Sequence, residues 1–195
     1  MASQSSGINI PNILTWTRIG LIPIFVGIFY LPENWIGLAQ KNLLATVFFV
    51  TAAITDWFDG YLARALKQTS AFGAFLDPVA DKLMVASALI MLVQLGRGDA
   101  LVAVIIIGRE ITISALREWM ARVGESASVA VATVGKFKTG TQMTAIPMLL
   151  FDASLLGIDM HLLGSILIYV ATALTLWSMG YYLYRAMPWL AKHRN

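Results

Sequence analysis

Six long apolar stretches, separated by short polar or Gly/Pro-containing connections, constrain the fold of this chain more than any other feature. A helix that crosses a membrane needs about 20 mostly apolar residues, and the stretches are close to that length. The 195 residues are 58% hydrophobic and only 13% charged, whereas a soluble domain carries about 25% charge. A soluble six-helix bundle would need a far more charged surface. We therefore predict an all-α integral membrane bundle of six transmembrane helices, forming one domain over residues 1–195. The predicted spans are Ile13–Leu31, Leu43–Ala63, Leu76–Leu95, Ala100–Trp119, Thr141–Leu156 and Leu162–Tyr184, and an earlier start of the fifth by several residues is left open.

The distribution of basic residues predicts how the bundle is oriented. Cytoplasmic connections are enriched in Lys and Arg. If the amino terminus is cytoplasmic, the inner connections and tail hold nine of these residues, and the outer connections hold only Lys41 and Arg97. We therefore expect both termini on the cytoplasmic side of a bacterial-type inner membrane. Residues 1–7 are small and polar with no basic run before an apolar core, so we expect a short disordered tail rather than a signal peptide.

Four aspartates are crowded around the connection between the second and third spans. Asp56 and Asp59 are three residues apart, and Asp77 and Asp81 are four apart, so each pair shares one helix face. Four carboxylates at one end of a helical hairpin repel one another unless positive charge lies among them. The chain has no cysteine, so an all-oxygen site for Mg²⁺ or Mn²⁺ is indicated. The alternative is ordinary pairing of these acids with nearby basic residues.

The same segment carries a family motif. It reads DWFDGYLAR, then eight residues, then GAFLDPVAD, and it spans Asp56–Asp81. All eight specified positions of the CDP-alcohol phosphotransferase motif are present at the right spacing, so the chain resembles that family. Three further segments, Asn9–Arg18, Arg109–Trp119 and Val134–Thr139, resemble the members that use sn-glycerol 3-phosphate as acceptor.

The resemblance implies an activity and a set of site residues. The family transfers a phosphatidyl group from CDP-diacylglycerol to a small alcohol, here sn-glycerol 3-phosphate, giving phosphatidylglycerophosphate and CMP. It implies two divalent ions held by the four aspartates, with Asp81 also acting as general base, and a homodimer in membrane lipid. No nucleic-acid partner is expected. The residues implied for the CDP site are Gly60, Ala63, Arg64, Gly73 and Ser70, with Asn12 and Thr15 at the first span.

Four basic residues are candidates for binding the acceptor phosphate. They are Arg109, Arg117, Lys136 and Lys138. A lone cation inside a span is costly, and Arg can bind a phosphate through two hydrogen bonds. Arg109 could instead be neutralised by adjacent Glu110, and the two lysines could be ordinary cytoplasmic basic residues.

Two rival functions remain open on the sequence. A sister transferase could use inositol phosphate or serine, although a basic pocket disfavours serine because serine carries no phosphate. A divalent-cation transporter is the second rival. Transport would favour acids near the bilayer midplane on several helices, whereas these four acids lie at one end of one hairpin.

Overall fold

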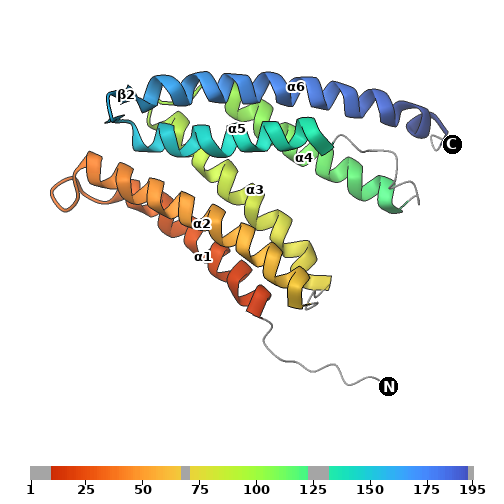
Figure 1. Cartoon of the computed structure of the whole chain (residues 1–195), viewed down its shortest axis with the longest axis horizontal. Coiled ribbons are helices and arrows are strands. Elements are labelled where there is room, and N and C mark those ends of the chain that lie inside the picture. The colour runs from red at the N-terminus through yellow and green to blue at the C-terminus, as the bar shows by residue number, and fades with distance from the viewer. Residues whose placement is uncertain (1–9, 67–70, 123–131, 193–195) are drawn as a thin grey trace. The chain divides into compact units, whose positions relative to one another are not determined.

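The part of the chain that the structure describes is mostly helical. The computed structural model describes residues 10–66, 71–122 and 132–192 (Figure 1). Two compact units, Met1–Met91 and Leu92–Asn195, each have their own buried side chains. The elements are α1 (Ile10–Tyr30), α2 (Leu38–Leu66), α3 (Ala71–Gln94), α4 (Ala100–Arg122), α5 (Ala132–Phe151), β1 (Ser154–Leu155), β2 (Ile158–Asp159) and α6 (Met160–Lys192).

These six helices confirm the all-α prediction, with one clear error in the limits of the fifth. The predicted stretch Thr141–Leu156 left room for an earlier start, and α5 begins at Ala132. Its predicted end was wrong, because α5 ends at Phe151. The early start was hidden by Lys138, a charged residue that is buried and pairs with Glu110. The predicted end was too late because Leu155 and Leu156 lie in a hairpin. β1 and β2 form this small antiparallel hairpin between α5 and α6.

Two of the described helices are long and apolar enough to cross a membrane. Leu38–Asp56 in α2 and Met160–Tyr184 in α6 meet both requirements, and Trp16–Tyr30 in α1 is a shorter apolar segment. The exposed surface of α6 carries large apolar and aromatic side chains, including Trp177, which is 74% exposed. Such a surface suits contact with lipid better than contact with water.

The unit Met1–Met91 contains α1 packed against α2. Phe25 and Ile28 of α1 are buried, as are Ala45 and Phe49 of α2. Gly37 precedes α2, and its backbone N–H donates to Gln40 Oε1 at 3.2 Å. This contact is one half of a capping box and fixes where α2 begins.

The unit Leu92–Asn195 is built on α6, against which both α5 and α4 pack (Figure 1). Gly164 of α6 lies where a Cβ would be 2.9 Å from Leu149 Cγ and 3.2 Å from the Ala145 carbonyl oxygen. A larger residue cannot fit without moving α5. Small residues at helix contacts are typical of membrane bundles, where close packing replaces the hydrophobic effect.

Two cations close the carboxyl ends of helices. Lys41 Nζ donates to the carbonyl oxygens of Phe29 at 3.4 Å and Leu31 at 2.5 Å, at the end of α1. Arg97 donates to the Leu150 carbonyl at 3.1 Å and pairs with Asp152 at 2.8 Å, at the end of α5. Burial lowers the pKa of the Arg97 guanidinium, and the charge of Asp152 acts in the opposite direction. The last carbonyls of a helix have no partner within the helix, so basic side chains stabilise them.

Hydroxyl groups within the helices bond mostly to their own backbone. Thr46, Thr144 and Thr172 each donate to the carbonyl four residues earlier, at 2.7–2.9 Å. This satisfies a polar group without water, as an apolar environment requires.

Candidate active site

Arg18 joins the two ends of the aspartate motif. Its Nη1 donates to Asp56 Oδ1 at 2.7 Å and to Asp81 Oδ1 at 2.9 Å. Arg18 comes from α1, Asp56 from α2 and Asp81 from α3, so three helices of one unit supply the cluster. The Arg18 side chain is only 3% exposed, whereas the carboxylates are 36% and 37% exposed. A buried cation therefore supports two carboxylates that can still be reached from outside.

This contact supports the argument that the acids need positive charge among them. The two carboxylate oxygens accept from the same Arg18 nitrogen, so both carboxylates face one point. Their chemistry, hard oxygen donors without sulfur, suits Mg²⁺ or Mn²⁺. Asp56 and Asp81 thus fit the predicted metal site.

The other two predicted ligands are placed by backbone only. Asp59 lies on α2 and Asp77 on α3, and their side chains are outside what the structure describes. Within the described residues no three acidic or histidine side chains form a metal-binding group. A four-aspartate site therefore stays a prediction.

The predicted CDP-binding residues are likewise located only along the helices. Gly60, Ala63 and Arg64 lie on α2, and Gly73 lies on α3. Asn12 and Thr15 lie on α1, and Ser70 is outside the described residues. The structure describes none of their side chains, so a nucleotide site at these positions remains a prediction.

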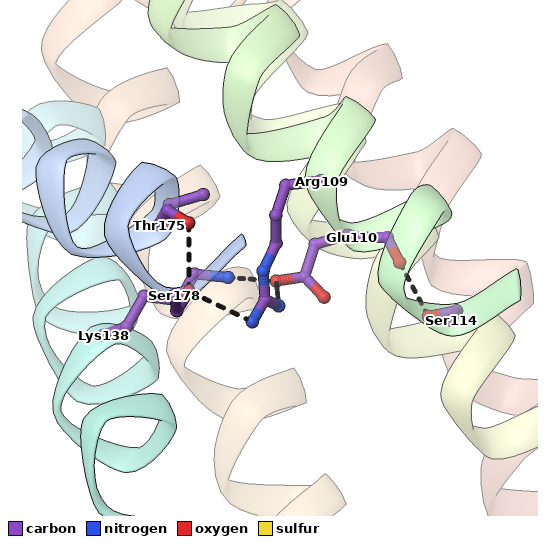
Figure 2. A network of polar contacts seen from close by, with 6 residues as sticks. All are labelled: Arg109, Glu110, Ser114, Lys138, Thr175 and Ser178. Atoms are coloured by element: carbon purple, nitrogen blue, oxygen red, sulfur yellow. Dashed lines mark hydrogen bonds and ion pairs between the residues drawn. The ribbon is translucent and has the colours of Figure 1, made fainter. Parts of the chain in front are cut away.

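A second polar cluster lies in the other unit, around Glu110 of α4 (Figure 2). Arg109 Nη1 donates to Glu110 Oε1 at 3.1 Å, and Lys138 Nζ of α5 donates to the same oxygen through a short contact. Arg109 Nη2 donates to Ser178 Oγ of α6 at 3.4 Å, and its guanidinium lies 6.0 Å from the ring centroid of Tyr182. Two buried cations thus share one partly exposed carboxylate.

Two atoms of this cluster are buried without a hydrogen-bond partner among the described residues. They are Arg109 Nε and Thr175 Oγ1. Ser178 Oγ donates to the Thr175 carbonyl at 2.9 Å, so Thr175 belongs to the same network (Figure 2). Buried polar atoms are normally paired, so each of these two atoms has hydrogen-bonding capacity that the described side chains leave unused.

The structure thus brings together two of the four predicted acceptor residues. Arg109 and Lys138 meet at Glu110, whereas the side chains of Arg117 and Lys136 are outside what the structure describes. The alternative that Glu110 neutralises Arg109 is observed. The sequence interpretation assigned no site role to Arg18, Ser178 or Tyr182. Arg18 carried a usable signal, because it lies inside a predicted span, as Arg109 does.

Comparison with known proteins shows the family of this chain. The model of the CDP-alcohol phosphatidyltransferase family matches residues 8–177, so the chain belongs to that family.

Proteins named CDP-diacylglycerol–glycerol-3-phosphate 3-phosphatidyltransferase resemble it over most of their length. The protein of Sodalis glossinidius (strain morsitans) is 50% identical over 190 residues, which are 95% of this chain and 99% of that protein. The protein of Pectobacterium atrosepticum is 50% identical over 177 residues, or 90% of this chain and 93% of that protein. The protein of Escherichia coli (strain K12) is 49% identical over 177 residues, or 90% of this chain and 93% of that protein.

Proposed function

We propose that this chain transfers the phosphatidyl group of CDP-diacylglycerol to sn-glycerol 3-phosphate, giving phosphatidylglycerophosphate and CMP. The names of the relatives, at about half identity over nearly the whole chain, support this reaction. The structural observation that supports it best is the contact of Arg18 with Asp56 and Asp81. One guanidinium nitrogen of Arg18 thus joins the first and last aspartates of the motif.

The four aspartates Asp56, Asp59, Asp77 and Asp81 would hold Mg²⁺ or Mn²⁺, as two ions. Bound divalent ions would neutralise the diphosphate and the departing CMP. Arg18 supports this arrangement from the buried side, because it holds two of the carboxylates in fixed positions. Gly60, Ala63, Arg64, Gly73, Ser70, Asn12 and Thr15 would bind the CDP group.

The transfer itself needs a base and an in-line geometry. The acceptor hydroxyl oxygen forms a bond to the lipid-side phosphorus, and the bond between that phosphorus and the CMP oxygen breaks. Asp81 accepts the hydroxyl proton, and CMP leaves with the electron pair. The Asp81 carboxylate is partly exposed, so an acceptor can reach it.

The basic cluster would bind the phosphate of the acceptor. Arg109 and Lys138 are buried cations that share one carboxylate, so positive charge exceeds negative charge at these three residues. The buried Arg109 Nε offers a further donor to an anion. Arg117 and Lys136 would complete the set. This excess of positive charge favours a phosphorylated acceptor over serine.

The remaining proposals concern the membrane. The six helices would form a transmembrane bundle in an inner membrane, with both termini and the active site cytoplasmic, and the chain would act as a homodimer. The two candidate spans and the family support membrane embedding.

Release of CMP from CDP-diacylglycerol tests the reaction. Purified protein with Mg²⁺ should release CMP with sn-glycerol 3-phosphate and not with serine or inositol phosphate, and EDTA should stop the release. Asp81→Asn should lower the rate at least about 100-fold. Asp99→Asn is the matched control, because Asp99 caps α4 through the Leu101 N–H at 2.7 Å and Asn caps equally well.

Each result of this assay has a distinct meaning. Release with another alcohol would keep the family and overturn the acceptor. No release with any alcohol, from folded protein that binds Mg²⁺, would overturn the enzyme proposal in favour of cation transport.

A further inference from the structure

The turn between β1 and β2 exposes three large apolar side chains. Leu156 at the tip is 95% exposed, and Leu155 and Ile158 on either side are 50% and 52% exposed. Tight turns usually carry Gly, Asn, Asp or Ser, because these residues fit the backbone and tolerate water. Packing against the residues that the structure describes therefore does not explain the apolar tip.

The backbone conformation is a second, independent reason why a leucine is unexpected at position 156. Leu156 has φ of 54° and Gly157 has φ of 81°, so both central residues of the turn are left-handed. Two-residue hairpin turns of this kind favour Asn-Gly or Asp-Gly. Leucine is disfavoured there by its backbone conformation as well as by its exposure. Its presence indicates a benefit from something outside the chain.

The hairpin also has one apolar face and one polar face. Leu155 pairs with Ile158, and Ser154 pairs with Asp159. Directly paired residues lie on the same face of a two-stranded ribbon, and successive residues lie on opposite faces. The ribbon is therefore amphipathic, which is the pattern expected at a boundary between an apolar and an aqueous phase.

The base of the hairpin is tied to its neighbouring helices. Asp152 pairs with Arg97 Nε at 2.8 Å and with His161 Nδ1 at 2.8 Å. Asp159 Oδ1 accepts from the Leu162 N–H at 3.1 Å, in the first turn of α6. These contacts fix the direction of the ribbon relative to α6 (Figure 1).

The position of the hairpin indicates which apolar phase this face would meet in the proposed membrane bundle. It directly precedes α6, whose segment Met160–Tyr184 is the longer of the two candidate spans among the described residues. A hairpin attached to the first residue of a spanning helix stands at the membrane surface. Lipid is therefore the apolar phase available to it.

We propose that residues 154–159 form an interfacial anchor, in which Leu155, Leu156 and Ile158 insert among the lipid acyl chains where α6 enters the bilayer. Ser154 and Asp159 face the headgroups and water. The anchor fixes the depth of α6 at that end, and it does not depend on the reaction proposed above.

Single spin labels test this directly, because the chain has no native cysteine. Leu156→Cys and the matched control Ser154→Cys are labelled, and the full chain is reconstituted into phosphatidylcholine–phosphatidylglycerol vesicles. Collision rates with oxygen, which enriches in lipid, and with a nickel chelate, which stays in water, report the depth of each label. The label at 156 should collide several-fold more with oxygen relative to nickel than the label at 154.

Three results would overturn the proposal. Nickel accessibility at 156 as high as at 154 would place the tip in water. An equally high ratio of oxygen to nickel collisions at both positions would show that the polar face also lies in lipid, against the proposed orientation. A label at 156 that is immobile and shielded from both reagents would identify a protein contact, such as a second copy of the chain.

A second variant keeps the test independent of the label at the tip. Leu156→Asn suits the left-handed turn, so the melting temperature in detergent should stay unchanged or rise. A label on Leu155→Cys in the same chain should then become more accessible to nickel. A lower melting temperature with unchanged accessibility would show that Leu156 serves internal packing, against the proposal.

Discussion

Replacing Arg18 by glutamine should destabilise the metal-free protein more than the magnesium-bound protein. In the structure Arg18 supplies the positive charge between Asp56 and Asp81. Without it the two carboxylates repel each other and lose two charge-assisted hydrogen bonds. In the proposed enzyme, Mg²⁺ at the same carboxylates would replace most of that charge.

The magnitude follows from the contacts. A hydrogen bond between charged groups contributes about 1.5–3 kcal/mol, so two would contribute roughly 3–6 kcal/mol. Both carboxylates are more than a third exposed, and solvent screening reduces this to about 2 kcal/mol. For a chain of this size, about 2 kcal/mol lowers the melting temperature by roughly 4–8 °C. We expect that loss in EDTA and less than half of it in saturating Mg²⁺.

The assay is thermal unfolding in detergent, with and without Mg²⁺, and Arg97→Gln is the matched control. Arg97 is also a buried arginine paired with a carboxylate, but its partner Asp152 is not a predicted metal ligand. Its loss of stability should be the same in EDTA and Mg²⁺. If Arg18→Gln also loses the same stability in both conditions, then Asp56 and Asp81 do not hold the metal.

Three further substitutions probe the second unit. Glu110→Gln leaves two buried cations without their shared carboxylate and should cost about 3 kcal/mol of stability. Added inorganic phosphate should restore part of that stability. If phosphate restores none of it, the cluster is not an anion site. Arg109→Lys keeps the charge but loses the forked donor, so KM for sn-glycerol 3-phosphate should rise about tenfold with KM for CDP-diacylglycerol unchanged. An equal rise in both constants would contradict that role. Gly164→Ala should lower the melting temperature by several degrees, since its Cβ would lie 2.9 Å from a side chain, whereas Gly180→Ala, with open space around it, should not. Equal losses of melting temperature in the two variants would refute the close approach of α5 to Gly164.

Hydropathy predicted the six helices because a long apolar segment that leaves water satisfies its backbone hydrogen bonds within a helix. It failed at the fifth helix for a reason outside local sequence. Lys138 makes the start of α5 look polar, yet its side chain is 2% exposed and pairs with Glu110, 28 residues earlier. Leu155 and Leu156 made the end look apolar, although both lie in the hairpin.

The candidate site was predictable as far as charge could be counted. The spacing of the aspartates and the cost of an arginine in a span selected Asp56, Asp81 and Arg109, and the structure places each of them in an ion pair. Their roles in binding metal or phosphate stay predictions. The pairing of Arg18 with acids 38 and 63 residues away was not predictable, because it depends on how three helices pack. The same holds for Ser178, which reaches Arg109 across 69 residues.

Lys41 and Arg97, which cap the carboxyl ends of α1 and α5, also affect the orientation in which the chain would insert into a membrane. In the predicted orientation these are the two basic residues on the outer connections, and both are buried against backbone carbonyls. In that orientation the folded chain would present little of their charge to the outer lipid headgroups. Removing them to strengthen the charge asymmetry would uncap α1 and α5. Correct insertion and folded stability therefore place opposite demands on the same two side chains.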